Sequence, residues 1–273
     1  MNVYGKSFEY NNISSEEYDV MLCSFESSTG TERNTGISYD ILSGDITPHR
    51  AIPNFYFRKY NEPLSFTIEL CKKTCNGSDL YFSTQEQKQI VKWLTGTKDF
   101  SKLKVVDFDS SDYHNNINYY CICTSYSESV INDKIICLYF EFKCNAPYAF
   151  YEENVIPFHS TNEQPALFLV ENYSDEISDD YYPIIELTAQ STGEVTIVND
   201  IYPEDKMILS LKNGQNLVID CFEADIVDNL GLFEYNTDTN LKWIRLSPGK
   251  NHITITGDVT GNIKCQYPRK VGI

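Results

Sequence analysis

Two stretches in the first half of the chain alternate apolar and polar residues with a period of two. In residues 64–70 every second side chain is Leu, Phe or Ile, and residues 136–142 repeat the pattern with Ile, Leu and Phe. Successive side chains of a strand point to opposite faces of its sheet. Both stretches are therefore predicted to be strands with one buried face.

One segment between these strands has the pattern of a helix. Ser83 and Glu86 have the spacing of a capping box, which marks a helix N-terminus. An apolar stripe follows at Ile90, Val91 and Leu94. The pattern predicts a helix over residues 83–94, with Gly96 ending it in the left-handed conformation.

Residues 27–54 consist of short apolar pieces separated by turn residues such as Gly30, Gly44 and Pro48. Little apolar area is available here to offset roughly 1 to 2 kcal/mol of backbone entropy per ordered residue. We therefore predict a protruding hairpin that neighbouring subunits order, the alternative being an ordinary two-stranded core hairpin. The residues predicted to make the assembly contacts are Ile37, Tyr39, Ile41, Leu42 and Ile46.

The second half of the chain predicts a β-sandwich, because short apolar stretches are separated by turn signals such as Asn213-Gly214 and Pro248-Gly249. The predicted strands are residues 194–198, 207–211, 217–222, 231–235, 241–246, 252–256 and 262–267. Polar and acidic residues dominate positions 157–182, which are predicted to be an interdomain connection and an exposed loop.

Composition supports a mainly β protein of two domains. The chain has 273 residues, of which 14% are aromatic and 22% charged, a balance that favours half-buried pleated surfaces over long solvated helices. No apolar signal core opens the sequence, and the longest apolar run, residues 135–140, is too short to span a membrane. We expect a soluble protein that is synthesised in the cytosol.

Charge excludes two classes of partner. The net charge is -17, distributed as -5 over residues 1–150 and -12 over residues 151–273. Nucleic-acid binding depends on neutralising phosphates with Lys and Arg, which are outnumbered here. We expect neither specific DNA binding nor attachment to an anionic membrane. The change in charge density supports a domain boundary near residues 147–157.

Candidate metal and catalytic residues form no convincing constellation. A zinc site could be drawn from Cys71, Cys75, Cys121 and Cys123, but the spacing lacks the usual two-residue separation between ligands. Nine cysteines without an export signal indicate buried free thiols. A calcium loop at residues 107–112 lacks the glycine and the closing Glu of an EF-hand. We expect no metal, no cofactor and no enzymatic activity, since the four histidines are scattered and no catalytic motif occurs.

One pair of residues suggests carbohydrate binding. Trp243 and Arg245 are two positions apart in a predicted strand, so both would lie on one face. An aromatic platform beside a guanidinium can stack on a sugar. The alternative reading is that Trp243 packs against the protein, and acidic residues 175–180 are read as a solvated loop.

The order of several weak motifs resembles the distal tail protein (Dit) family of long-tailed bacteriophages. The motifs are VYGKSFEY, the turn-rich excursion, STQEQKQIVKWLTG, LKVVDFD, NYYCICTSY, IICLYFEFKCNAPYAF, LSPGKNHITITG and IKCQYPRK. The resemblance extends over essentially the whole chain. It implies a ring-building N-terminal domain over residues 1–150, with a β-sandwich, one helix and a hairpin belt, and a galectin-like C-terminal sandwich over residues 157–273.

The resemblance also implies a function. Family members form a hexameric ring that joins the tail tube to the tail-tip proteins, among them the tail-associated lysin and receptor-binding proteins. Carried over, the ring-building element is Val3 to Tyr10, the belt Ser28 to Asn54 and the family helix Ser83 to Leu94. We thus expect a non-enzymatic hub at the virion tail tip, with an acidic channel that passes DNA without binding it. The alternative is an adhesin that recognises host cell-wall polysaccharide through its C-terminal sandwich.

Overall fold

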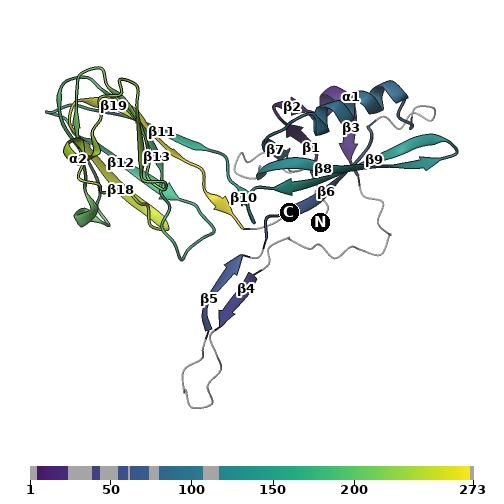
Figure 1. Ribbon diagram of the computed structural model, residues 1–273, viewed down its shortest axis with the longest axis horizontal. Helices are drawn as coiled ribbons and strands as arrows, with labels where there is room; N and C mark the ends of the chain where they lie inside the picture. The colour runs from purple at the N-terminus through teal and green to yellow at the C-terminus, as the bar shows by residue number, and fades with distance from the viewer. Residues whose placement is uncertain are drawn as a thin grey trace, which may run out of the picture. The chain divides into compact units, whose positions relative to one another are not determined.

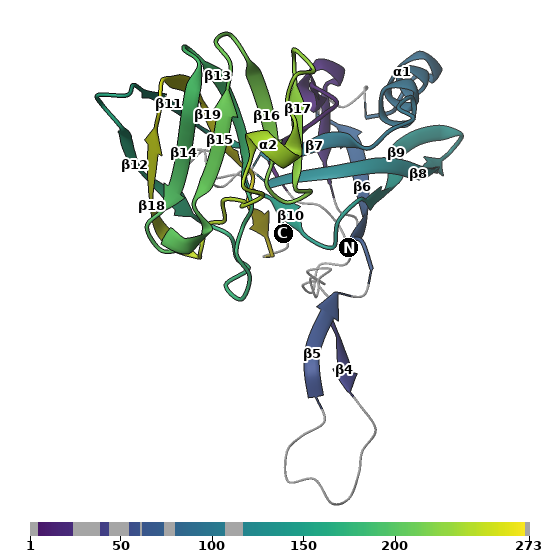
Figure 2. The ribbon, with the colours of Figure 1, turned by 60° about the vertical axis from the view of Figure 1, so that its left-hand side comes forward.

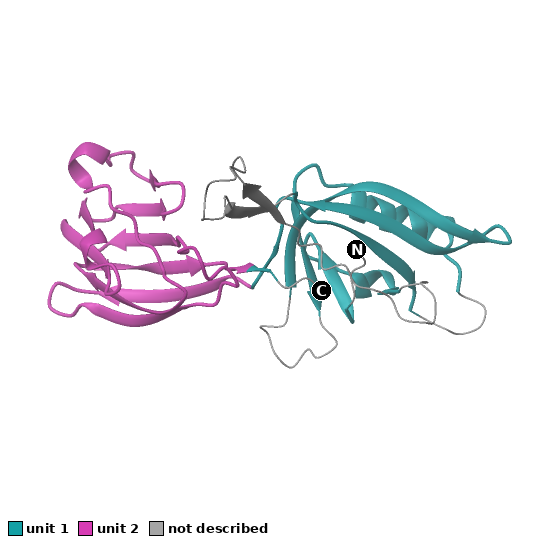
Figure 3. Ribbon diagram, turned by 90° about the horizontal axis from the view of Figure 1, so that it is seen from below, with its two compact units in different colours: residues 1–151, 269–273 teal, residues 152–268 magenta. Residues whose placement is uncertain are grey.

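The computed structural model (Figure 1) describes residues 5–23, 39–43, 55–60, 62–73, 80–106 and 117–270, with the main chain alone at 39–43 and 55–60. The chain divides into two compact units (Figure 3). Unit 1 comprises Met1–Tyr151 and Arg269–Ile273, and unit 2 comprises Glu152–Pro268. The end of the chain therefore returns to the first unit.

Unit 1 is built on one antiparallel sheet of nine strands. Seven of them follow the order β2-β1-β7-β8-β9-β6-β3, while β10 pairs with β8 and with β20. The strands are β1 (Ser7–Tyr10), β2 (Ile13–Ser14), β3 (Val20–Leu22), β6 (Ser65–Lys72), β7 (Ser101–Val106), β8 (Ile117–Ile131), β9 (Lys134–Cys144), β10 (Ala149–Phe150) and β20 (Pro268–Arg269). The two strands predicted from period-two alternation are confirmed as β6 and β9, which pair from Ser65↔Lys143 to Leu70↔Leu138.

Helix α1 (Thr84–Thr95) lies across one face of this sheet (Figures 1 and 2). The predicted capping box is confirmed: the Ser83 hydroxyl accepts from the Glu86 amide at 3.3 Å, and the Glu86 carboxylate accepts from the Ser83 amide at 2.7 Å. The expectation for Gly96 is wrong, because its φ of -78° is right-handed. Glycine is required there for another reason: a Cβ would lie 2.4 Å from the Lys92 carbonyl oxygen. No helix in the described ranges is long and apolar enough to cross a membrane.

The core of unit 1 lies between α1 and the sheet. Ile90, Trp93 and Leu94 of the helix pack into one cluster with the apolar faces of the strands. The Trp93 ring is stacked on both Phe8 and Tyr18, at centroid distances of 5.4 and 4.7 Å. The 3-10 helix η1 (Ser15–Tyr18) presents Tyr18 to this stack. The apolar stripe of α1 thus fixes the helix to the sheet.

Unit 2 has two antiparallel sheets, which confirms the predicted β-sandwich (Figure 2). One has five strands in the order β11-β19-β13-β16-β17: β11 (Asn154–Ser160), β19 (Val259–Cys265), β13 (Ile184–Ala189), β16 (Asn216–Asp220) and β17 (Asp225–Asp228). The other has four in the order β12-β18-β14-β15: β12 (Ala166–Asn172), β18 (Gly249–Thr256), β14 (Gly193–Asn199) and β15 (Met207–Leu211). Alternate residues of both sheets are buried, among them Ile185 and Leu187 of β13 and Val195 and Ile197 of β14.

Residues 157–182 are not simply a connection and a loop, as the sequence suggested. They supply most of β11 and all of β12, the edge strands of the two sheets. Polar residues were misleading here, because an edge strand has only one neighbour and exposes much of its surface. Some apolar residues of these strands stay exposed as well: Leu167 of β12 is 74% accessible.

Two of the predicted strands of unit 2 are wrong. Residues 231–235 form a loop that ends at the short helix α2 (Tyr235–Asp238), and residues 241–246 form only an isolated bridge at Leu246. The Asp228 carboxylate explains the first case, because it accepts the amides of Leu230, Leu232 and Phe233 and so holds the segment as a loop. At the start of the second, Leu241 has a φ of +57°, which breaks an extended strand.

Candidate assembly surfaces

The turn-rich excursion contains a hairpin formed by β4 (Tyr39–Ser43) and β5 (Phe55–Tyr60). Its register runs from Tyr39↔Tyr60 to Ser43↔Phe55, with an irregularity after Leu42. Among the described strands, β4 and β5 pair only with each other. Of the predicted contact residues, Tyr39, Ile41 and Leu42 belong to β4, whereas Ile37 and Ile46 lie outside the described residues. Their role in assembly stays a prediction.

A second hairpin, β8–β9, was not predicted as an assembly element. Its turn is formed by Asn132 and Asp133, whose φ angles are 51° and 61°. Two positive φ values in succession match the right-handed twist of a hairpin, and Asn and Asp tolerate them best after glycine. Beside the turn, Val130 and Ile131 are 48% and 54% exposed. The Asn-Asp pair between apolar residues was the signal that could have revealed this hairpin.

The β8–β9 hairpin is attached to α1 by polar contacts. The Gln87 side chain donates to the Tyr126 hydroxyl at 2.7 Å and also contacts the Glu128 carboxylate. The Tyr126 hydroxyl donates to the same carboxylate at 2.8 Å. Burial, opposed by the Gln87 hydrogen bond and reinforced by Glu128, raises the pKa of Tyr126. These contacts join the hairpin to the helix.

An open depression of about 660 Å³ borders α1 and the first strands. It is lined by Asn11, Ile13, Glu17, Tyr18, Gln89, Lys92, Trp93, Gly96 and Thr97. The Trp93 indole donates to the Tyr10 carbonyl at 3.0 Å, which fixes the aromatic floor. Polar side chains surround this floor, an arrangement suited to a protein contact rather than to an enclosed small molecule.

The strand predicted to carry Trp243 and Arg245 is not formed, and their contact with a sugar stays a prediction. The two residues do not share a strand, and Arg245 is engaged within unit 2. Its guanidinium contacts Asp180 at 3.1 Å and Asp205 at 2.8 Å, and it lies 3.9 Å from the centroid of the Tyr202 ring. The acidic stretch 175–180 therefore is not merely solvated, since Asp180 is one of the partners of Arg245.

A shallow polar depression of about 420 Å³ lies instead on the five-stranded sheet. The lining residues come from the four adjacent strands β11, β19, β13 and β16, and Glu186, Thr188, Asn216 and Asn262 are among them. Thr188 donates to Asn216 at 2.6 Å, and Glu186 is paired with Lys264 at 2.5 Å. Sequence reasoning missed this surface because cross-strand register, rather than spacing along the chain, brings its residues together.

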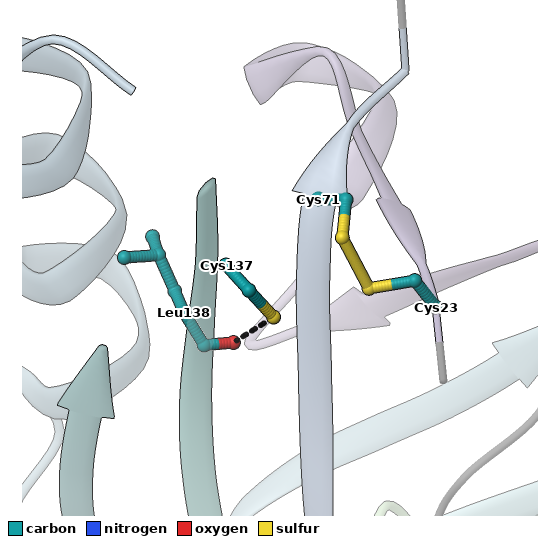
Figure 4. Close-up of a disulfide and its surroundings, with 4 residues drawn as sticks. All are labelled: Cys23, Cys71, Cys137 and Leu138. Carbon is teal, nitrogen blue, oxygen red and sulfur yellow. Dashed lines mark hydrogen bonds between the residues drawn. A yellow bond between two sulfur atoms is a disulfide. The ribbon is translucent and has the colours of Figure 1, made fainter. Parts of the chain in front are cut away.

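The expectation that all cysteines are free thiols is wrong for Cys71. It forms a disulfide with Cys23, 48 positions earlier in the chain (Figure 4). The pairing of β3 with β6 brings the two residues together, so local spacing gave no indication of it. Among the other residues of the imagined zinc site, Cys121 and Cys123 are free thiols of β8, and burial raises the pKa of each. Cys75 lies outside the described residues.

The two histidines that lie in the described ranges are separated from each other. His159 on β11 and His252 on β18 are exposed on different sheets. His49, His114 and the aspartates of the suggested calcium loop lie outside the described ranges. Among the described His, Cys, Asp and Glu residues, one group of three, Cys23, Cys71 and Cys137, has its ligand atoms close enough together to hold a metal ion.

The sequence matches known families over both of its units. Residues 3–146 match a family described as a phage tail protein N-terminal domain, and residues 148–265 match one described as a phage tail C-terminal domain. The family matches define the class: this is a phage tail protein. The chain belongs to this phage tail protein family, and the resemblance of its motifs to the distal tail protein (Dit) family agrees with that assignment.

Solved structures share the fold at low sequence identity. The Dit protein of phage SPP1 (gp 19.1) superposes with a TM-score of 0.60 and 12% identity, over 96% of this chain and 98% of that one. Chains of the phage P2 baseplate in its activated conformation, with calcium and with strontium, each give a TM-score of 0.50 and 9% identity. The first covers 96% of this chain and 98% of that one, and the second 95% and 97%. No curated protein sequence matches the chain. The family matches identify the phage tail as the location of the protein.

Proposed function

We propose that six copies of this protein close into a ring that joins the tail tube to the proteins of the tail tip. The main support is the similarity of fold along the full length to the SPP1 Dit protein, whose structure is described as a paradigm of the hub adsorption apparatus in phages that infect Gram-positive bacteria. A partial match could reflect one shared domain. Here both units take part, with 96% of the chain covered.

The free edges of strands would supply surfaces for such a ring. The nine-stranded sheet ends at β2 and β3, which have two and three residues, and β4–β5 has no other partner among the described strands. Free edges offer unsatisfied main-chain donors and acceptors to a neighbouring copy. A head-to-tail interface that closes by rotation satisfies these groups in every copy.

The charge of the chain suits a channel through which DNA passes. Six copies would multiply a net charge of -17 by six, so the field of the ring would repel phosphate groups. A channel that held DNA through cationic side chains would slow its release. The proposed hub is structural and non-enzymatic, and its partners are the tube protein, a tip protein such as the tail lysin, and a receptor-binding protein.

Native mass spectrometry and negative-stain microscopy of the purified chain test the ring directly. We expect a single closed oligomer with six-fold symmetry at high protein concentration. A chain that remains monomeric both alone and when mixed with the tube and tip proteins would contradict the proposal. In an electrophoretic shift assay at physiological salt, duplex DNA should not be retained, and micromolar binding would contradict the inert channel.

Carbohydrate binding by unit 2 is a second candidate, favoured only by the polar depression on the five-stranded sheet. Its hydroxyl, amide and carboxylate groups can hydrogen-bond to sugar hydroxyls. Calorimetric titration of the full chain with host cell-wall polysaccharide tests it. Asn262→Ala, within the depression, should abolish binding, and Asn154→Ala, exposed on β11, should not. If the unmodified chain does not bind, the second candidate is wrong and the ring is unaffected.

A further inference from the structure

Three cysteine sulfurs meet at one corner of the nine-stranded sheet. Cys23 follows β3, Cys71 lies in β6 and Cys137 lies in β9, and their Sγ atoms are all within 4.8 Å of one another. Two of them form the disulfide, and the third points toward it (Figure 4). Nothing in the proposed hub function requires a third sulfur at this place.

The strand register explains why the three sulfurs share a face. Leu70 and Leu138 are paired across β6 and β9, and both are fully buried in the core. Cys71 and Cys137 are the next residues beyond this pair, so they lie opposite one another on the face of the sheet away from the core. On the other side of β6, Met21 pairs with Cys71, and the Cys23 amide donates to the Glu69 carbonyl at 3.0 Å.

We propose that Cys23, Cys71 and Cys137, when reduced, bind a thiophilic d¹⁰ cation such as Zn²⁺ through three thiolates. Tetrahedral zinc with Zn–S bonds of about 2.3 Å places its sulfurs roughly 3.8 Å apart. Sulfurs already within 4.8 Å of one another reach that spacing by small side-chain rotations. The Cα atoms of Cys23 and Cys71, 6.2 Å apart, can remain in place.

The three cysteines differ in their exposure to solvent. Cys137 is fully buried, whereas Cys23 and Cys71 are partly exposed. A cation can therefore enter from the side of the exposed pair, and a water molecule can occupy the fourth position there. The sulfur of Cys137 supplies the third ligand from the buried side of the site. Three protein ligands with one open position are a common arrangement for zinc.

The metal-bound state and the disulfide exclude one another, so the site is sensitive to oxidation. A small-molecule disulfide, the oxidant class of an oxidising compartment, accepts two electrons from the thiolates of Cys23 and Cys71. The S–S bond of the small molecule breaks and the Cys23–Cys71 bond forms. Three protons are taken up, two by the released small thiols and one by Cys137, and the divalent cation leaves. In a reducing cytoplasm the thiolate state is favoured instead.

Cobalt is a suitable probe, because Co²⁺ in a thiolate site gives an intense charge-transfer absorption. The full chain would first be reduced and then separated from the reductant under anaerobic conditions. It would next be titrated with Co²⁺, and the bound Co²⁺ would be competed with Zn²⁺. We expect one Co²⁺ per chain, displaced by one Zn²⁺, and no thiolate band in the oxidised chain. Cys137→Ser should weaken Co²⁺ binding by at least the ~10-fold that even outer-shell substitutions cost.

Two controls keep the result interpretable. Cys221→Ser replaces a buried free thiol of unit 2 and should bind Co²⁺ like the unmodified chain. Oxidised Cys137→Ser should still contain the Cys23–Cys71 disulfide by peptide mass mapping, which shows that the variant folds. A reduced chain without a cobalt–thiolate band overturns the proposal, and so does a band that Cys137→Ser leaves unchanged.

Discussion

The indole of Trp93 is hydrogen-bonded to the main chain of Tyr10, with 3.0 Å between Nε1 and the carbonyl oxygen. These residues are far apart in the sequence, and their contact fastens the helix to the first strand of the sheet. The Trp93 side chain is only 6% exposed and is stacked on both Phe8 and Tyr18. One side chain therefore combines apolar burial, ring stacking and a satisfied donor.

Trp93→Ala should destabilise unit 1 by about 3 to 5 kcal/mol, because it removes a large buried side chain and leaves a cavity. Differential scanning calorimetry of the full chain measures the loss as a lower unfolding temperature of one transition. Trp243→Ala is the matched control, since the chain has two tryptophans and Trp243 is only partly buried in unit 2. An equal or larger effect at Trp243 would contradict the assigned role of Trp93.

Gly261 should tolerate no side chain. A Cβ at this position of β19 would lie 2.1 Å from the Glu186 carbonyl oxygen and 2.7 Å from the Phe158 ring. We expect Gly261→Ala to cost about 1 to 3 kcal/mol through overpacking. Gly193→Ala in β14, where a Cβ meets nothing within 4 Å, should be close to neutral. Thermal unfolding of the two variants gives the comparison, and similar losses would contradict it.

Acid should weaken unit 2 through Asp205. The hydrogen bond from Lys242, opposed by burial and reinforced by Arg245, holds the pKa of Asp205 below its ordinary value of 3.8. A folded-state pKa below the unfolded one contributes stability above the unfolded value, and that stability is lost as pH falls through the folded value. Asp205→Asn should therefore lower the unfolding temperature near neutral pH and have less effect near pH 3.

Glu204→Gln provides the control for this measurement, because it removes the charge of a neighbouring exposed carboxylate and should leave the unfolding temperature near neutral pH close to that of the unmodified chain. If Asp205→Asn is as destabilising in acid as at neutral pH, then packing rather than charge explains its effect.

Removing the β4–β5 hairpin should abolish ring assembly without preventing the chain from folding. Because these strands pair only with each other among the described strands, replacing residues 39–60 by a short glycine linker leaves the nine-stranded sheet intact. We expect a soluble chain with a near-native unfolding temperature that no longer forms the ring in native mass spectrometry. Unfolding of unit 1 would instead show that the hairpin belongs to its core.

A milder variant tests the predicted contact residues of the same hairpin. Ile41→Lys should weaken oligomerisation, since Ile41 is predicted to meet a neighbouring copy, whereas Ser43→Lys on the same strand should have little effect. Equal oligomerisation by both variants would remove Ile41 from the interface.

The sequence was most informative where a structural signal is local, although the local expectation for Gly96 was wrong. The capping box at Ser83 and the alternation in residues 64–70 and 136–142 each depend on neighbours along the chain, and each was predicted correctly. The same reasoning missed β13 and placed β11 and β12 in a connecting segment. An edge strand can carry polar residues because half of its surroundings are water, so its composition resembles that of a loop.

Long-range contacts explain the other differences. Residues 231–235 have the composition of a strand, but Asp228 captures the amides that a strand would pair. The ion pair of Arg245 with Asp180 was not foreseen, because the two residues are 65 positions apart in the sequence. The three-cysteine cluster depends on the order β9-β6-β3, which no spacing rule reveals. Topology, rather than residue type, was the missing information.

The Cys23–Cys71 bond also has a mechanical consequence. It closes a covalent loop with a sequence separation of 48 that contains the whole β4–β5 hairpin. Restricting the unfolded chain in this way is worth about 4 kcal/mol on the loop-entropy scale. In the oxidised chain, this bond carries a force that pulls on the hairpin, and so the force does not separate β3 from β6. The hairpin can therefore bear tension while β3 stays paired with β6.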